Sequence, residues 1–153
     1  MPRKVFGTVS EDDAPASVLL DTCAVIWMVS TTRLPTRVID VIARASQAGG
    51  VYVSTASAWE IGLLGRPSRK PMPSFHPDPK TWFARVMALP GVKEARITPA
   101  IAVDSSRLPG NRHSDPADRF IIATARDLGM PIVTGDRKII AYAAAGHVGV
   151  IPC

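Results

Sequence analysis

Four carboxylates stand where side chains of neighbouring strands and helices can reach one ligand. They are Asp21, Glu60, Asp118 and Asp136. Asp21 directly follows the apolar run at 18–20, and Asp136 follows the run at 131–134 after one glycine. Carboxylates gathered at one edge of a sheet repel one another unless a cation neutralises them. Oxygen ligands suit Mg²⁺ or Mn²⁺, and the reaction that such an ion supports in a basic protein is phosphodiester hydrolysis.

Each of these carboxylates also has a purely structural interpretation. An Asp between a strand and a helix often caps the helix, which applies to Asp21 and Asp136. Asp115, followed by a proline and by Asp118 three residues on, forms a capping-box-like pattern with Asp115 as the cap. Glu60 stands among apolar residues and could belong to a buried ion pair. The convergence of four separate segments favours the metal site.

The elements that must position these carboxylates alternate between strand and helix. The sequence predicts strands at 18–20, 51–53, 95–98, 131–134 and 148–151. It predicts helices at 24–29, 36–48, 59–64, 80–89, 99–107, 115–128 and 137–145. Apolar strands separated by helices indicate a doubly wound α/β domain, with a parallel sheet of about five strands and helices on both faces. Ligands of such sheets bind outside the carboxyl ends of the strands.

Composition indicates one soluble domain that attracts polyanions. The chain has 18 Lys and Arg against 13 Asp and Glu, a net charge of +5. We expect a flexible tail at 1–16, a folded domain at 17–153 and an exposed, basic, proline-rich loop at 66–79. No apolar stretch approaches the roughly 20 residues that span a bilayer, and no signal peptide is recognisable, so we expect no membrane association and a cytoplasmic protein.

Several side chains are candidates for substrate contact. Those that could bind an RNA backbone are Arg66, Arg69, Lys70, Arg112 and Arg119. Dispersed surface charge is the alternative interpretation, except that Arg112 and Arg119 border the predicted pocket. The tryptophans at 27, 59 and 82 could stack on bases, although their helical spacing with aliphatic residues favours burial in the core. Cys23 is expected to be a small buried side chain.

Other reaction classes lack their required residues. The three histidines are scattered without a second soft ligand at zinc spacing. No serine lies in a nucleophile elbow, and no glycine-rich phosphate loop is present. A haloacid-dehalogenase-like phosphatase needs an acid two residues after Asp21, where this chain has Cys23. A receiver-like signalling domain needs paired acids that are absent.

The same residues resemble the PIN-domain ribonucleases, in particular the VapC-like toxins of type II toxin–antitoxin pairs. The motifs that carry the resemblance are Leu19-Leu-Asp21-Thr22, Ser57-Ala-Trp59-Glu60-Ile61, His113-Ser-Asp115-Pro-Ala-Asp118-Arg119 and Val133-Thr-Gly-Asp136. The resemblance covers the folded part of the chain. It implies that the four carboxylates form the metal-binding catalytic quartet, with Asp115 as a helper or cap. The basic loop at 66–79 and the leader before Ser17 depart from many relatives.

This resemblance implies an endoribonuclease that depends on Mg²⁺ or Mn²⁺ and leaves a 5′-phosphate and a 3′-hydroxyl. Asp21, Asp118 and Asp136 would hold one or two ions, and Glu60 would bind a second ion or orient the attacking water. The resemblance also implies a small antitoxin as partner, docked on the helices that follow the first two strands, and a homodimer. The alternative is a catalytically inactive PIN-like module that binds RNA or a partner protein.

Overall fold

The computed structural model describes residues 14–30, 33–110 and 114–153. Within these ranges five strands form one parallel sheet in the order β3-β2-β1-β4-β5. The strands are β1 (Ser17–Leu20), β2 (Gly50–Ser54), β3 (Val92–Ala95), β4 (Ile132–Thr134) and β5 (Val150–Pro152). The predicted α/β class, with a parallel sheet of about five strands, is confirmed.

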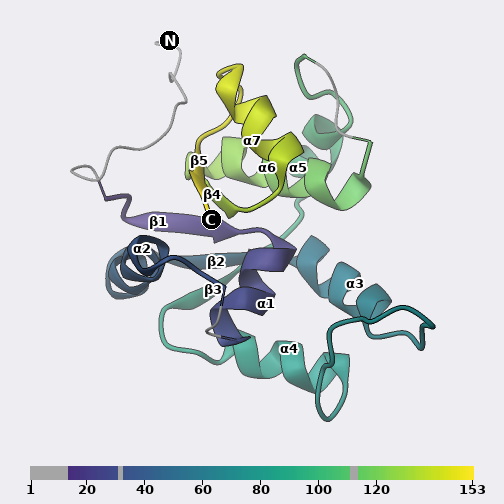
Figure 1. Ribbon diagram of the computed structural model, residues 1–153. Coiled ribbons are helices and arrows are strands. Elements are labelled where there is room, and N and C mark those ends of the chain that lie inside the picture. Colours follow the sequence, from purple (N-terminus) through teal and green to yellow (C-terminus); the bar gives the residue numbers. More distant parts are fainter. Residues whose placement is uncertain (1–13, 31–32, 111–113) are drawn as a thin grey trace.

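Helices cover both faces of this sheet (Figure 1). One face carries α1 (Thr22–Ser30), α2 (Thr36–Gln47), α3 (Thr55–Leu64) and α4 (Pro79–Met87). The other face carries α5 (Pro99–Ser105), α6 (Pro116–Leu128) and α7 (Arg137–Ala144). Successive residues of β1 alternate between the two cores, because Val18 and Leu20 pack toward the first set of helices and Leu19 toward the second.

The chain changes direction in the sheet between β1 and β4. From β1 it proceeds outward to β3, and it then crosses back to place β4 on the other side of β1. Leu20 pairs with Val133, and the Asp21 amide donates to the Val133 carbonyl over 3.1 Å. The connections after β1 and β4 therefore leave the carboxyl ends of two neighbouring strands in opposite directions. Ligands of open α/β sheets bind at this switch point.

The third strand differs from its predicted position. The sequence predicts a strand at 95–98, whereas β3 ends at Ala95. Lys93 and Glu94 are exposed on this edge strand and interrupt the apolar pattern on which the prediction rested. Thr98, which the prediction placed inside the strand, instead caps α5 by accepting a hydrogen bond from the Ile101 amide.

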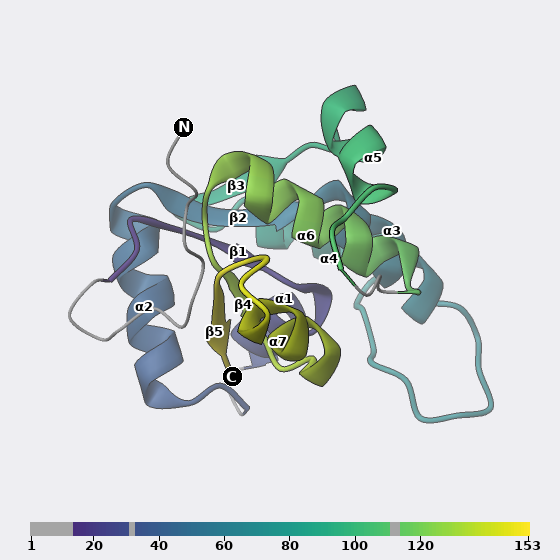
Figure 2. The ribbon, with the colours of Figure 1, turned by 90° about the horizontal axis from the view of Figure 1, so that it is seen from above.

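The described residues show where the folded chain begins and how the proline-rich segment runs. Residues 1–13 of the tail lie outside the described residues, but Ala16 already belongs to the fold, because its carbonyl accepts a 2.7 Å hydrogen bond from Gly49. The proline-rich segment protrudes as a long loop between α3 and α4 (Figure 2). Phe75 anchors it, since its ring is buried and packs edge-on against Trp82 at 4.9 Å between centroids. Pro79, predicted in the loop, begins α4 behind the cap Asp78.

No helix in the described part of the chain is long and apolar enough to cross a membrane.

Candidate active site

One pocket at the carboxyl edge of the sheet gathers all five acidic residues singled out from the sequence. Its volume is about 230 Å³. The residues that line it are Asp21, Thr22, Cys23, Trp27, Glu60, Asp115, Asp118, Gly135 and Asp136. They come from the ends of β1 and β4 and from α1, α3 and the start of α6. The convergence that the sequence predicts is therefore present.

Asp21 is the most buried of these carboxylates, with 5% of its surface exposed. One oxygen accepts a 2.7 Å hydrogen bond from the Ala24 amide, so Asp21 also caps α1. The other oxygen accepts from the Thr134 hydroxyl, and that hydroxyl in turn accepts a 2.9 Å bond from the Asp136 amide. Thr134 thus ties the carboxylate after β1 to the backbone after β4.

Glu60 reaches the pocket from α3 and accepts a hydrogen bond from a hydroxyl group of α1. The Thr22 hydroxyl donates to its Oε1 atom. Ser57, fully buried one turn earlier in α3, lies with its Oγ atom 3.0 Å from the Thr22 Oγ1 atom. Among the described residues no Lys or Arg forms an ion pair with Glu60, so the alternative of a buried ion pair finds no partner there.

Asp115 and Asp136 line the pocket and also cap helices. Asp115 caps α6, because its Oδ1 accepts from the amides of Ala117 at 2.9 Å and Asp118 at 3.4 Å. Asp136 caps α7 through its Oδ1, which accepts from the Lys138 amide at 2.7 Å. The capping interpretation is therefore right for Asp21, Asp115 and Asp136, and it does not exclude metal binding, because a carboxylate has further lone pairs.

Burial and neighbouring charges raise the pKa of three carboxylates of this pocket, Asp21, Glu60 and Asp118. Burial, followed by the charges of Asp115, Asp136, Glu60 and Asp21, raises the pKa of Asp118 to about 7. Burial is also the main cause of the raised pKa of Asp21 and Glu60, which hydrogen bonds from Thr134 and Thr22 partly offset. The fully ionised site is unfavourable without a cation, as expected for carboxylates that share one pocket.

This electrostatic arrangement predicts the stability of the metal-free protein. The pKa of Asp118 rises from 3.8 to about 7 on folding, so its contribution to stability is present below pH 3.8 and is lost as the pH rises through about 7. Allowing for its partial exposure, we expect Asp118→Asn to be more stable than the parent by about 1 to 2 kcal/mol at pH 8 in EDTA. Urea unfolding at pH 4.5 and pH 8 measures this.

The matched control for that measurement is Asp127→Asn, which removes an exposed carboxylate from the last turn of the same helix. We expect its effect on stability to be the same at both pH values. Equal pH dependence for the Asp118 and Asp127 variants would show that the charges of the pocket do not oppose folding.

The donor set fits a hydrated divalent ion. In residues 14–30, 33–110 and 114–153, no group of three or more His, Cys, Asp or Glu side chains is arranged to hold one metal ion directly. Mg²⁺ needs fewer protein ligands, because it usually binds through one or two carboxylates and keeps several waters. Asp136 offers an Oδ2 atom to which no described group donates a hydrogen bond. Hard oxygen donors with raised pKa values therefore suit Mg²⁺ or Mn²⁺.

The structure corrects three expectations about neighbouring side chains. Cys23, expected to be buried, is exposed and lines the pocket. Partial desolvation of its thiol and the nearby carboxylates raise the pKa of Cys23 to about 11. Trp59 is 57% exposed, and Trp27 is half-buried outside both cores. Trp82 packs against the core as expected. Thr134, which stands in the motif Val133-Thr-Gly-Asp136, was not predicted to contact the site, although it lies only two residues before Asp136.

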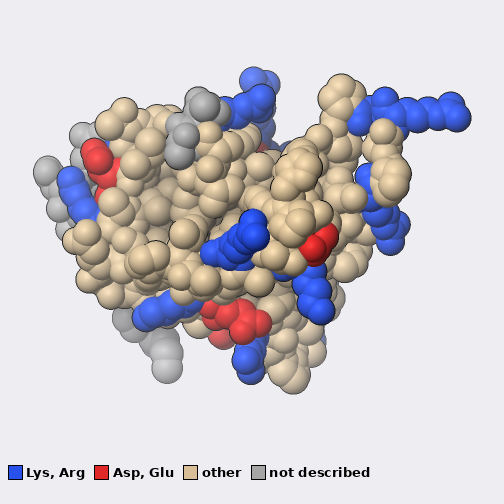
Figure 3. Space-filling view, turned by 90° about the horizontal axis from the view of Figure 1, so that it is seen from below, with Lys and Arg blue, Asp and Glu red and all other residues tan. Residues whose placement is uncertain are grey.

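The candidate RNA-binding residues lie in different surroundings. Arg66, Arg69 and Lys70 are exposed on the loop between α3 and α4. Figure 3 shows Lys and Arg side chains on the projection at the right of the surface. Arg119 is half-buried in α6, directly after Asp118. Arg112 lies outside the described residues. None of the three loop residues lines the carboxylate pocket.

Comparison with known proteins identifies the fold and its family. Ribonuclease VapC22 of Mycobacterium tuberculosis is 41% identical over 51 residues, which are 33% of this chain and 39% of that protein. VapBC2 of Rickettsia felis, solved with a DNA fragment from its promoter, shares the fold with a TM-score of 0.65 and 10% identity, covering 89% of this chain and 98% of that chain.

VapBC-5 of Mycobacterium tuberculosis aligns with a TM-score of 0.55 and 18% identity, over 91% of this chain and 100% of that one. The PIN domain matches residues 18–145, a range that contains both strand ends and every carboxylate of the pocket. The match covers most of the chain, and the parallel sheet with acids at its switch point agrees with it. The chain therefore belongs to the PIN-domain family.

Proposed function

We propose that this PIN-domain protein is an endoribonuclease that depends on Mg²⁺ or Mn²⁺ and acts as the toxin of a toxin–antitoxin pair. The observation that carries the proposal is the pocket in which carboxylates from the ends of β1 and β4 and from α3 and α6 meet, where burial and the neighbouring charges raise the pKa of Asp118 to about 7. The names of the relatives support it, since one is called a ribonuclease and others were solved as VapBC complexes.

Each acid has a role that its surroundings support. Asp21, held by Ala24 and Thr134, is the fixed ligand, and Asp118 and Asp136 complete the set for one or two ions. Glu60, held through Oε1 by Thr22, either binds a second ion or orients the attacking water with its other oxygen. When bound, the ion would polarise that water and stabilise the leaving oxygen. Asp115 keeps the start of α6 in place as its cap.

The ends of the cleaved RNA test this chemistry. Attack by water leaves a 5′-phosphate and a 3′-hydroxyl, whereas metal-independent ribonucleases that use the 2′-hydroxyl leave a 2′,3′-cyclic phosphate. We expect RNA incubated with Mn²⁺ to yield 5′-phosphate ends that can be ligated and sequenced, and EDTA to stop the reaction. Absence of Mn²⁺ binding at millimolar metal in isothermal titration, together with absence of cleavage, would favour the inactive binding module.

The basic loop supplies a second prediction. Arg69 and Lys70 are exposed on a loop that Phe75 fixes to the core, so we infer that they contact the phosphates of a bound strand. Replacing both with Ser is expected to weaken RNA binding and to lower the slope of log affinity against log salt by about 1, as expected for lost phosphate contacts.

A salt titration of binding to a labelled single-stranded RNA measures that slope. The matched control replaces Arg44 in α2 and Lys93 in β3, which removes the same charge from the amino-terminal side of the sheet. Equal slopes for the two double variants would mean that the loop contributes only to the overall charge.

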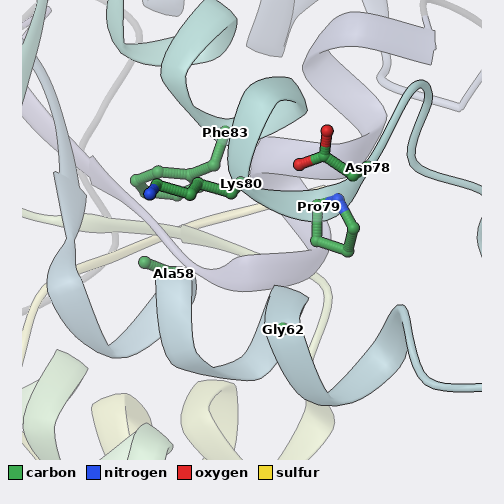
Figure 4. A pocket seen from close by; sticks show the side chains of 6 residues that line it. All are labelled: Ala58, Gly62, Asp78, Pro79, Lys80 and Phe83. Atoms are coloured by element: carbon green, nitrogen blue, oxygen red, sulfur yellow. The ribbon is translucent and has the colours of Figure 1, made fainter.

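A groove between α3 and α4 is the surface that we assign to the antitoxin. Its volume is about 410 Å³. Figure 4 shows Ala58 and Gly62 of α3 facing Pro79, Lys80 and Phe83 of α4 across it. Small residues on one side and an aromatic ring on the other leave space for the apolar side chains of a partner segment. Both helices follow the second strand, and the family resemblance implies docking on the helices after the first two strands.

A further inference from the structure

Trp27 is a large side chain that the core of the protein does not use. The core cluster on the α1 side of the sheet includes Ala24, Val25, Ile26 and Met28, yet neither cluster includes Trp27. Its side chain is half-buried and is the aromatic member, among the described residues, of the pocket that holds the carboxylates. Cys23, one helical turn earlier, lines the same pocket, so this face of α1 is turned toward the acids.

The position of the indole ring is fixed by the turn between β4 and α7. A Cβ atom built on Gly135 would lie 2.9 Å from the Cη2 and Cζ3 atoms of Trp27 and 3.1 Å from the Cys153 carbonyl oxygen. Such distances leave no room for any side chain at Gly135. The six-membered ring therefore lies directly against the backbone that links Thr134 to Asp136, so the ring and the Asp136 carboxylate are held by the same turn.

We propose that Trp27 is the stacking platform for the nucleobase next to the phosphate that is cut, so that the enzyme selects an unpaired base at that position. This inference rests on the proposed ribonuclease function and adds a contact to it. Bases of single strands bind proteins by stacking on aromatic side chains. No described residue accepts a hydrogen bond from the indole N–H group of Trp27, which leaves a donor for the base or the ribose.

The pocket favours a nucleotide over a protein segment beside Trp27. Carboxylates that hold a divalent ion attract a phosphate, and the base attached to that phosphate must lie within one nucleotide of it. Trp27 is the lining residue that offers an aromatic surface at this distance, because the other described lining residues are acids, a hydroxyl, a thiol and a glycine. The apolar groove between α3 and α4 is a separate surface with none of these residues.

Binding of a short RNA to an inactive protein tests the proposal without relying on cleavage. The Asp118→Asn protein serves as the inactive parent for all variants. Its binding to a labelled single-stranded octanucleotide in Mn²⁺ is measured by fluorescence anisotropy. The RNA is used intact and in a series in which a single abasic nucleotide stands at each position in turn. We expect Trp27→Ala to weaken binding of the intact RNA by roughly 10-fold to 100-fold, and Trp27→Phe to retain most of the affinity. At one position along the RNA, removal of the base should weaken binding to the parent as much as Trp27→Ala weakens binding of the intact RNA. With the abasic RNA, Trp27→Ala should then cause no further loss of affinity.

Tryptophan fluorescence gives a second readout that a merely structural role would not produce. RNA should quench the parent, and Trp27→Phe should bind without that quenching. Trp59→Ala, which removes an exposed tryptophan outside the pocket, is the control and should behave as the parent does.

Three results would overturn the proposal. Unchanged RNA affinity in Trp27→Ala would refute the stacking contact and leave the ribonuclease function intact. Equal losses for intact and abasic RNA would assign Trp27 to the shape of the pocket, and normal RNA binding with lost antitoxin binding would assign it to the protein partner. Absence of both RNA binding by the parent and cleavage by the native protein would refute the proposed function itself.

Discussion

Asp21→Asn is expected to abolish metal-dependent RNA cleavage, lowering kcat/KM by roughly 1000-fold or more, while the protein stays folded. The substitution removes the charge of the most buried carboxylate and keeps its shape. The remaining side-chain oxygen can still accept from the Ala24 amide, and the new amide group can donate to Thr134, whose hydroxyl oxygen accepts as well as donates. Loss of activity would then report lost metal binding and not unfolding.

Cleavage of a labelled RNA over a range of Mn²⁺ concentrations measures this effect, with isothermal titration of Mn²⁺ and thermal unfolding alongside. Asp104→Asn, at an exposed acid of α5 away from the pocket, is the matched control and should keep normal kcat/KM. Near-normal cleavage by purified Asp21→Asn would remove Asp21 from the catalytic set, even if the other acids prove essential.

The position of the site could be predicted from the sequence because it depends on topology. Short strands that are apolar on both faces predict a parallel sheet, and the carboxyl ends of parallel strands share one edge. Asp21 and Asp136 follow two such strands directly, so their meeting requires only that β1 and β4 be neighbours, as they are. The caps Ser54 and Asp115 were also predictable, because their hydrogen bonds are local to one turn of helix.

What the sequence did not reveal depends on contacts between distant segments. The exposure of Cys23 and Trp27 depends on which face of α1 turns toward β4, and the apolar sequence of α1 has no polar face from which to predict this. The position of β3 depends on its pairing with β2, because the charged pair Lys93 and Glu94 breaks its pattern. The burial of Phe75 could not be predicted from its polar loop, because it depends on the contact with Trp82 in α4.

Gly62→Trp is expected to weaken inhibition by the proposed antitoxin roughly 100-fold or more, while the proposed RNA cleavage by the free protein is unchanged. Gly62 is exposed in the last turn of α3, and a Cβ atom built on it meets no atom within 4 Å. A large side chain there can therefore enter the groove without disturbing the fold, and it would occupy the space assigned to the partner. Glu60, which we propose as the catalytic acid of α3, lines the other pocket.

The inhibition constant of a candidate antitoxin, measured in the RNA cleavage assay, tests this prediction. Gly62→Ala is the matched control, because it removes the same glycine without filling the groove. It should keep full inhibition and raise stability by up to about 1 kcal/mol, since alanine favours the helix interior over glycine. If Gly62→Trp is inhibited as tightly as Gly62→Ala, the antitoxin binds elsewhere. If only Gly62→Trp loses inhibition, one face of α3 binds the partner in the groove. The other face then carries Glu60 in the carboxylate pocket, where cleavage is proposed.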